Sequence, residues 1–247
     1  MSRYKIVLEF EGTNLIGWQQ NPGGTSVQSL LQDAIFKFCG EHADVVAAGR
    51  TDAGVHAMGM VAHVDIDCEH IPDTVMRAMN FYLKSAPVVV LACELVNDDF
   101  HARFSCTRRS YRYVILNRPS PTILDVNKVW WMPRKLNIGK IRTAAMQLVG
   151  NHDFTSFRAS ECQAKSPIKT LDMVKIKKSG EYIIIDFSAR SFLHHQVRNM
   201  VGTLVEIGLG KPYGINEIFA AKNRSAAGPT APASGLYFVS AEYANNG

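Results

Sequence analysis

Two apolar periodicities, alternating along the first part of the sequence, limit the fold of this chain most strongly. The segment YKIVLEF at 4–10 places an apolar side chain at every second position, which is typical of a strand with one buried face. The apolar residues of 27–38 recur at helical spacing and end before Gly40, so this segment predicts an amphipathic helix. Thr25 and Gln28 have the spacing of a capping box at its start.

The same alternation continues through the rest of the first half. Strands are expected at about 44–48 and 59–66 and in the segment VVVLACELV at 88–96. A helix is expected at about 72–83, between the second and third of these strands. The first half is therefore expected to contain two strand and helix units.

The second half has more extended segments. Its expected elements are an extended run at 100–116, a helix at 138–149 between Asn137 and Gly150, a hairpin turning at KSGE (178–181), a helix at 191–208, a short helix at 215–223 and a strand at 235–243. Strands that alternate with helices and hairpins predict an α+β fold with a largely antiparallel sheet and with helices packed on one face.

Length and composition are those of a globular protein. The 247 residues, 47% hydrophobic and 20% charged, suffice for one large domain or two small ones. The start has no apolar signal segment and no run of 18 residues lacks a polar break, so we expect neither secretion nor a membrane span. The five cysteines are widely separated and lack zinc spacing, which indicates a reducing cytoplasm and no metal.

Positive charge is concentrated in one segment. The net charge of +5 is mild, but residues 100–124 contain no acidic residue. The arginines of this segment are Arg103, Arg108, Arg109, Arg112 and Arg118. Strand alternation places Arg109, Tyr111 and Tyr113 on one face and Arg108, Ser110 and Arg112 on the other. Such a segment favours phosphate binding, and Tyr111 is either a core residue or a platform on which a base stacks.

Several common chemistries lack support in the sequence. It contains no phosphate-binding P-loop motif, no G-x-S-x-G nucleophile elbow and no cysteine in a nucleophile motif. Its glycine-rich segment AAGRTDAGVHAM, 47–58, offers one carboxylate where glycoside hydrolysis normally needs two. A single acid, Asp52, favours a reaction that does not activate water.

Asp52 and Arg198 each have a structural and a functional interpretation. An aspartate in a glycine-rich turn is often an Asx turn or a helix cap. Here, however, Arg50 stands close enough to help keep the acid ionised, and the segment follows an expected strand, where loops often carry function. Arg198 stands beside an apolar helix stripe, so it either extends to solvent or reaches inward to a carboxylate.

Five motifs together resemble the bacterial tRNA pseudouridine synthase A family. They are GWQQNP at 17–22, GRTDAGVHA at 49–57, SYRY at 110–113, FLHHQVRNMVG at 192–202 and GPTAPASGLYFVSAEY at 228–243. The resemblance implies a cofactor-free and metal-free conversion of uridine to pseudouridine at positions 38 to 40 of the tRNA anticodon stem-loop. It also implies a homodimer and a pseudouridine synthase fold of two similar halves, 1–104 and 105–247, around a central cleft.

The resemblance also assigns roles to single residues. Asp52 matches the catalytic aspartate and Arg198 the arginine that pairs with the acid. Tyr111 matches the tyrosine that stacks on the target uracil and that is a candidate to take the proton from C5. Arg50 matches a residue that helps displace the flipped base, while His194 and His195 receive no role. Attack at C1′, addition to C6 and removal of the C2′ proton all stay open for Asp52.

The target uridine lies in a paired stem, so we expect the base to be flipped out, with phosphate contacts from Arg108, Arg109 and Arg112. The motif GWQQNP is expected near the RNA, although Trp18 is equally compatible with the core. A non-catalytic RNA-binding module, with Asp52 only forming a turn, is the alternative function. An inactive dimer partner is a weaker alternative, because the aspartate motif is intact.

Overall fold

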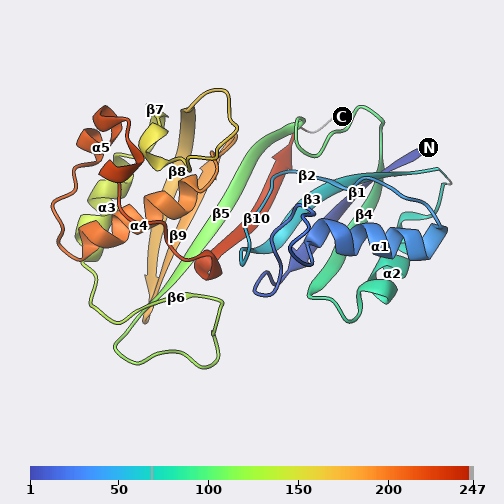
Figure 1. The fold of residues 1–247 in the computed structure, drawn as a ribbon, viewed down its shortest axis with the longest axis horizontal. Coiled ribbons are helices and arrows are strands. Elements are labelled where there is room, and N and C mark those ends of the chain that lie inside the picture. Colours follow the sequence, from blue (N-terminus) through green and yellow to red (C-terminus); the bar gives the residue numbers. More distant parts are fainter. Residues whose placement is uncertain (68, 245–247) are drawn as a thin grey trace. The chain divides into compact units, whose positions relative to one another are not determined.

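The computed structural model describes residues 1–67 and 69–244 and is drawn as a ribbon in Figure 1. The chain forms two compact units. Unit 1 contains residues 1–107 together with the segment that begins at Tyr237, and unit 2 contains Arg108–Leu236. The last strand of the protein therefore packs with the N-terminal unit.

Unit 1 is a sheet with two helices. Its elements are β1 (Ser2–Phe10), α1 (Val27–Cys39), β2 (Val46–Ala47), β3 (His56–Ile66), α2 (Pro72–Leu83), β4 (Val88–Val96) and β10 (Leu236–Tyr243). The strand order is β4-β1-β3-β10, and β2 pairs with β3. β1 is antiparallel to both of its neighbours, whereas β10 runs parallel to β3. This sheet carries the loop that contains Asp52.

The core of unit 1 lies between the sheet and its helices. Tyr4, Ile6 and Leu8 of β1 are completely buried, as their period of two predicts. The two helices contact each other and α2 contacts β4, and Figure 1 shows both helices on the same face of this sheet. The periodic pattern therefore identified both the strand and the face that it buries.

The predicted cap of α1 is wrong by one residue. Ser26 is the N-cap: its hydroxyl accepts a hydrogen bond from the Ser29 backbone at 3.0 Å, and the Ser29 hydroxyl accepts one from the Ser26 backbone at 3.1 Å. Thr25 is exposed, and the Gln28 side chain instead donates to the carbonyl of Val45 at 3.2 Å. The buried serine satisfies the first turn, which leaves the glutamine free to hold the chain before β2.

Unit 2 consists of mainly antiparallel strands with helices. Its elements are β5 (Cys106–Asn117, which begins in unit 1), β6 (Trp130–Met132), α3 (Ile138–Met146), β7 (Gly150–Asp153), β8 (Ile168–Ser179), β9 (Tyr182–Ala189), α4 (Gln196–Gly208) and α5 (Ile215–Ala221). Short 3₁₀ turns lie at Thr155–Phe157, Arg224–Ala226 and Ala233–Gly235. The strand order is β5-β9-β8-β7, and β6 pairs with β5 in parallel. The predicted α+β class with mainly antiparallel strands is confirmed.

The helix expected at 191–208 is shorter than predicted. It begins at Gln196, because the Gln196 side chain accepts a hydrogen bond from the Leu193 backbone at 2.8 Å and His195 adopts a left-handed φ of 60°. Within Gln196–Gly208 every residue except Arg198 is buried, so α4 is the central helix of its unit rather than a helix with one apolar stripe. The helix expected to reach 149 ends at Met146, and Gly150 begins β7.

The cysteines and the lengths of the helices bear on two further expectations from the sequence. Among the described residues, Cys39, Cys93, Cys106 and Cys162 take part in no disulfide, and Cys68 lies outside the described residues. No helix in 1–67 or 69–244 is both long and apolar enough to cross a membrane.

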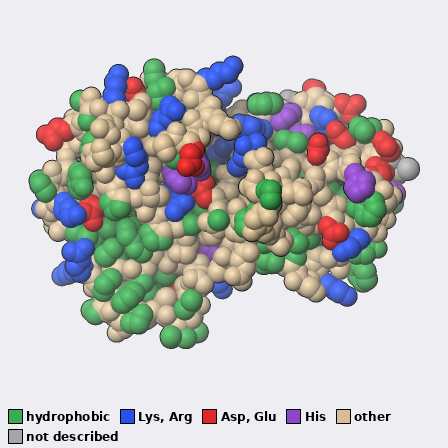
Figure 2. All heavy atoms as spheres, viewed as in Figure 1, with side chains coloured by type: hydrophobic (Ala, Val, Ile, Leu, Met, Phe, Trp, Pro, Cys, Tyr) green, Lys and Arg blue, Asp and Glu red, His purple; other side chains and the backbone are tan. Residues whose placement is uncertain are grey.

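The segment between β5 and β6 exposes Ile123, Leu124 and Val126, and Figure 2 shows hydrophobic side chains at the surface there.

Candidate active site

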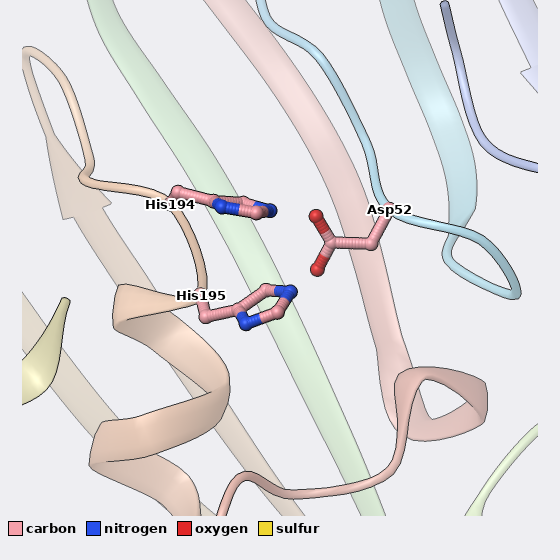
Figure 3. A group of neighbouring side chains, drawn as sticks. All are labelled: Asp52, His194 and His195. Carbon is pink, nitrogen blue, oxygen red and sulfur yellow. The ribbon is translucent and has the colours of Figure 1, made fainter. Parts of the chain in front are cut away.

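Asp52 stands on the loop between β2 and β3. Figure 3 shows its carboxylate projecting from this loop, and the residue is half-buried. The backbone of the loop is tied to residues near the end of β1: Asp52 forms a bridge with Gly17, and Trp18 donates to the carbonyl of Thr51 at 3.0 Å. Within the loop, Val55 donates to the carbonyl of Asp52 at 3.2 Å. Backbone hydrogen bonds therefore fix the position of the acid.

Two glycines allow this close approach of backbone segments. A Cβ on Gly17 would lie 2.5 Å from the carbonyl oxygen of Thr51, and its φ of +102° already disfavours other residues. A Cβ on Gly12 would overlap the carbonyl oxygen of Val55. Neither glycine belongs to the aspartate motif, and neither was identified from the sequence as a support of Asp52.

The motif GWQQNP thus supports the loop through its first residues. Trp18 is only 3% exposed, so the core alternative for this side chain is correct. Its carbonyl accepts a hydrogen bond from Gln28 at the start of α1 at 3.0 Å. The residues that follow, 19–22, are exposed.

His56, four positions after Asp52, is a structural residue that sequence reasoning passed over. It is 2% exposed, and its Nδ1 accepts a hydrogen bond from the backbone of Gly12 at 3.0 Å. Its ring stacks on Tyr237 of β10 with 4.8 Å between centroids. His56 thereby joins the end of the Asp52 loop to β10. Arg50 lies on the same loop with its residue exposed.

Tyr111 and Tyr113 share one face of β5 but differ in their surroundings. Tyr111 is 9% exposed and meets Phe192 edge to face, with ring centroids 5.1 Å apart. Tyr113 is completely buried, and its hydroxyl donates to the carbonyl of Pro232 at 2.7 Å. Burial raises the pKa of Tyr113, although the nearby Arg198 guanidinium acts in the opposite direction. Both tyrosines are therefore buried, and Tyr113 is the more deeply buried of the two.

Arg198 is the one residue of Gln196–Gly208 that is not buried. Its Nε donates to the carbonyl of Ala231 at 2.8 Å, and its own carbonyl accepts from the Ala231 backbone at 3.1 Å. The Arg198 side chain is thus held at Nε and does not extend freely into solvent. Directly before α4, His194 and His195 are half-buried with ring centroids 4.0 Å apart, and Figure 3 shows where they stand.

The arginines of β5 follow the predicted alternation. Arg109 is 8% exposed and donates to the carbonyl of Arg190. On the other face, Arg112 forms a hydrogen-bonded ion pair with Asp186 at 2.7 Å, which raises the pKa of the arginine. Arg108 lies 3.8 Å from Asp172 and is the most exposed of the three. Two of the three arginines thus hold neighbouring parts of unit 2.

The structure groups the site residues by unit. Unit 1 places Arg50 and Asp52 on one loop, and unit 2 places Tyr111 on β5 and Arg198 in the first turn of α4. The acid stands on an irregular loop, whereas the aromatic residue and the cation stand on regular elements. A carboxylate can react with a sugar or a base, and an aromatic ring can stack on a base. A guanidinium can neutralise an acid.

The family model and the two relatives described below all belong to the tRNA pseudouridine synthases. The tRNA pseudouridine synthase family matches residues 6–105 and 144–244 of this chain. The tRNA pseudouridine synthase A of Paramagnetospirillum magneticum is 50% identical over 249 residues, which cover 100% of this chain and 97% of that protein. The protein of the same name from Rhodospirillum centenum is 53% identical over 245 residues, covering 98% and 100% respectively.

A solved Cbf5-Nop10-Gar1 complex contains a chain with a weak likeness. The alignment covers 95% of this chain and 57% of that chain, at 10% identity and a TM-score of 0.37. This likeness is too weak to bear on fold or function. The family match and the two full-length relatives suffice: this chain belongs to the tRNA pseudouridine synthase family.

Proposed function

We propose that this protein converts uridine to pseudouridine in tRNA. The observation that carries the proposal is the family match over two long segments, the first of which includes Asp52 and the second Arg198. The reaction breaks the bond between N1 of uracil and C1′ of ribose, turns the base and joins C5 to C1′. C5 loses a proton and N1 gains one, so the change is an isomerisation without net redox. We propose no cofactor and no metal for it.

Asp52 is the proposed catalytic residue. The loop has little side-chain bulk beside Asp52, because Ala53 and Gly54 follow the acid and because Gly17 packs directly against the loop backbone. A carboxylate presented in this way can approach the sugar or the base of a nucleotide without bulky neighbours in between. Attack at C1′, addition to C6 and removal of the C2′ proton are three routes that use the same acid.

Tyr111 is the residue proposed to stack on the uracil and to take the proton from C5, and Arg198 is the proposed partner of the acid. The ring of Tyr111 is held by a perpendicular contact with Phe192, which fixes the plane of the ring for stacking. Arg198 is anchored through Nε, so its guanidinium has a defined direction. We assign to Arg50, on the exposed part of the Asp52 loop, the displacement of the flipped base.

We propose that the uridine is flipped out of its stem, at an unstacking cost of a few kcal/mol that stacking and phosphate contacts offset. Figure 2 shows basic and acidic side chains interspersed on the visible face, so phosphate binding is expected from local groups rather than from the net charge. Arg108 is the best placed of the three β5 arginines for a phosphate contact. Arg109 and Arg112 hold the strand and add positive charge.

The finer proposals concern the substrate site and the assembly. We assign modification to positions 38, 39 and 40 of the anticodon stem-loop, in the cytoplasm, by a homodimer in which one tRNA contacts both subunits. We keep the division into an N-terminal half, 1–104, that carries the acid, and a C-terminal half, 105–247, that carries the tyrosine and the arginine. Light scattering on the purified protein tests the dimer, and a monomeric mass would contradict it.

The test of the function is to map pseudouridine in tRNA that has been incubated with the purified protein. Carbodiimide adducts on pseudouridine stop reverse transcription, so each modified position gives a stop. We expect new reverse-transcription stops at tRNA positions 38 to 40, and no new stops with heat-inactivated protein. Stops outside the anticodon arm would keep the chemistry but overturn the substrate site, and the absence of any stop would overturn the function.

A further inference from the structure

A short segment of unit 2 lies along α4 and ends beside Arg198. We call residues 227–232, with the sequence AGPTAP, the α4 strap. The backbone of Gly228 donates to the hydroxyl of Thr203 at 2.9 Å, and the backbone of Ala231 donates to the carbonyl of Arg198 at 3.1 Å. The strap therefore runs antiparallel to the helix, from its middle back to its first turn.

The strap contacts the helix backbone to backbone. A Cβ on Gly202 would overlap the carbonyl oxygen of Pro229, and a Cβ on Gly228 would lie 2.7 Å from Cα of Thr203. Such an approach is close enough that a small shift of the strap must move the atoms hydrogen-bonded to it. The strap is thus a part of the scaffold that sets the position of residue 231.

A partly buried polar network centred on Arg224 holds the strap. One terminal nitrogen of Arg224 donates to the carbonyl of Gly228 at 2.9 Å. The other donates to Oδ1 of Asn199 at 3.0 Å and to the hydroxyl of Thr230 at 3.1 Å. Thr230 in turn donates to the same Oδ1 at 2.7 Å. One guanidinium therefore joins two residues of the strap to one residue of the helix.

Asn199 connects this network to the rest of the unit. It is completely buried, and its amide nitrogen donates to the carbonyl of Phe157 at 2.8 Å. Both ends of its amide are thus used, so its orientation is determined. Burial lowers the pKa of Arg224 from its ordinary high value, and the acceptors described around it are neutral oxygens. Neutral acceptors for a guanidinium provide geometry rather than charge neutralisation.

The network lies next to the residue proposed to pair with the acid. Asn199 follows Arg198 in the helix, and Thr230 precedes Ala231 in the strap, whose carbonyl accepts the Nε bond of Arg198 at 2.8 Å. On the other side, the hydroxyl of Tyr113 donates to the carbonyl of Pro232. Residue 231 is therefore held from both directions.

We propose that Arg224, through Asn199 and Thr230, is a positioning residue for Arg198 in the isomerisation. The inference rests on the proposed function. Arg224 contacts the strap and the helix, and it acts by fixing the carbonyl that orients the Arg198 guanidinium. Its loss should misplace that guanidinium, and a misplacement of about 1 Å at a reacting group costs up to about 100-fold in rate.

The experiment compares Arg224→Met with Arg3→Met in single-turnover pseudouridine formation. Arg3 is a matched structural control, since it also bonds backbone carbonyls, those of Asp98 and Phe100, and also holds a neighbouring residue, Asp65. Both variants should lower the unfolding midpoint. Only Arg224→Met should lower the rate constant, by about 10- to 100-fold, with tRNA affinity within about threefold of the wild type.

A double variant separates positioning from a general structural role. Arg198→Lys removes the Nε–H group that donates to the carbonyl of Ala231. In this background, Arg224→Met should lower the rate constant by less than about threefold further if Arg224 acts through Arg198. Multiplication of the two losses would overturn the proposal, and so would an unchanged rate in Arg224→Met. If Arg224→Met does not fold, Thr230→Val removes one hydroxyl of the network at nearly constant volume, and an unchanged rate there would overturn it.

The wild-type protein is measured first on the same tRNA. If it forms no pseudouridine, the proposed function fails and takes this inference with it. If it forms pseudouridine and the Arg224 and Thr230 variants do so equally fast, only the inference fails.

Discussion

The two units present their candidate site residues by different means. Unit 1 presents Asp52 on a loop whose position depends on backbone hydrogen bonds and on glycines. Unit 2 presents Tyr111 and Arg198 on a strand and a helix, and it holds them through side-chain contacts with Phe192 and with the α4 strap. The difference indicates which substitutions should displace the site residues of each unit. In unit 1 this is the addition of a Cβ to a glycine, and in unit 2 it is the loss of a polar group.

The largest expected effect is that of Asp52→Asn. The substitution keeps the size of the side chain and removes the anion, so we expect pseudouridine formation to fall by about 1,000-fold or more. Binding of tRNA should stay within about threefold, because other groups contact the phosphates. Release of tritium from C5-labelled uridine measures the reaction. Asp44→Asn, at an exposed position of the same unit, should keep full activity, and residual activity near wild type in Asp52→Asn would refute its catalytic role.

A pair of tyrosine substitutions tests unit 2. Tyr111→Phe keeps the stacking ring but removes the hydroxyl proposed to take the proton from C5, so we expect about a 100-fold loss of rate. Tyr113→Phe leaves the carbonyl of Pro232 without its donor and should reduce stability by about 1–2 kcal/mol. Rates and urea midpoints of both variants check this. The opposite pattern would exchange the roles of the two tyrosines.

A pair of glycine substitutions tests unit 1. Gly17→Ala places a Cβ against the carbonyl of Thr51, beside Asp52, so we expect a rate about tenfold lower and a stability loss of about 2–3 kcal/mol. Gly40→Ala shares the positive φ, +79°, but has open space around it, and should cost only about 1 kcal/mol. Equal rates in the two variants would show that the loop does not depend on its glycine support.

The last expected effect concerns stability rather than rate, and it is a pH dependence of unit 1. Burial, with the charges of Arg3 and His101, lowers the pKa of His63 from 6.5 to about 4, against a smaller opposite effect of Asp65. Between these values the unfolded chain binds a proton that the folded unit does not, so the free energy of unfolding should fall by about 2 kcal/mol as the pH falls from 6.5 to 4.

Hydrogen exchange at the Ala102 amide can measure this loss, since that amide donates to Nδ1 of His63 at 3.2 Å. His63→Gln should flatten the dependence. Neighbouring groups with lowered pKa values, His101 and Asp65, contribute in the same direction, Asp65 at lower pH. An unchanged protection of Ala102 down to pH 4 would contradict the account.

Elements with a strong periodic pattern were predictable from the sequence. The helix at 72–83 and the strand at 88–96 match the structure closely, because the helix begins at a proline and the strand is a short apolar run that follows Pro87. The cap of α1 was less certain, since Thr25 with Gln28 and Ser26 with Ser29 both fit the spacing. The reciprocal hydrogen bonds of Ser26 and Ser29 decide between them.

Features that depend on contacts distant in sequence were not predictable. The contact of Gly17 with Asp52, and that of Arg224 with Asn199, each join residues that are far apart along the chain. Alternation in β5 was predicted, but the burial of Arg109 was not, because alternation gives two faces without saying which one is covered. The start of α4 was missed because a positive φ at His195 has no signature in the sequence.

The most direct test of the central claim is a crystal structure of the Asp52→Asn variant bound to a tRNA anticodon stem-loop, since this variant should bind but not react. The account predicts a uridine flipped out of the stem, with its C1′ and its base against the side chain of residue 52. A structure with the RNA bound and the carboxamide of residue 52 buried away from every nucleotide would contradict it.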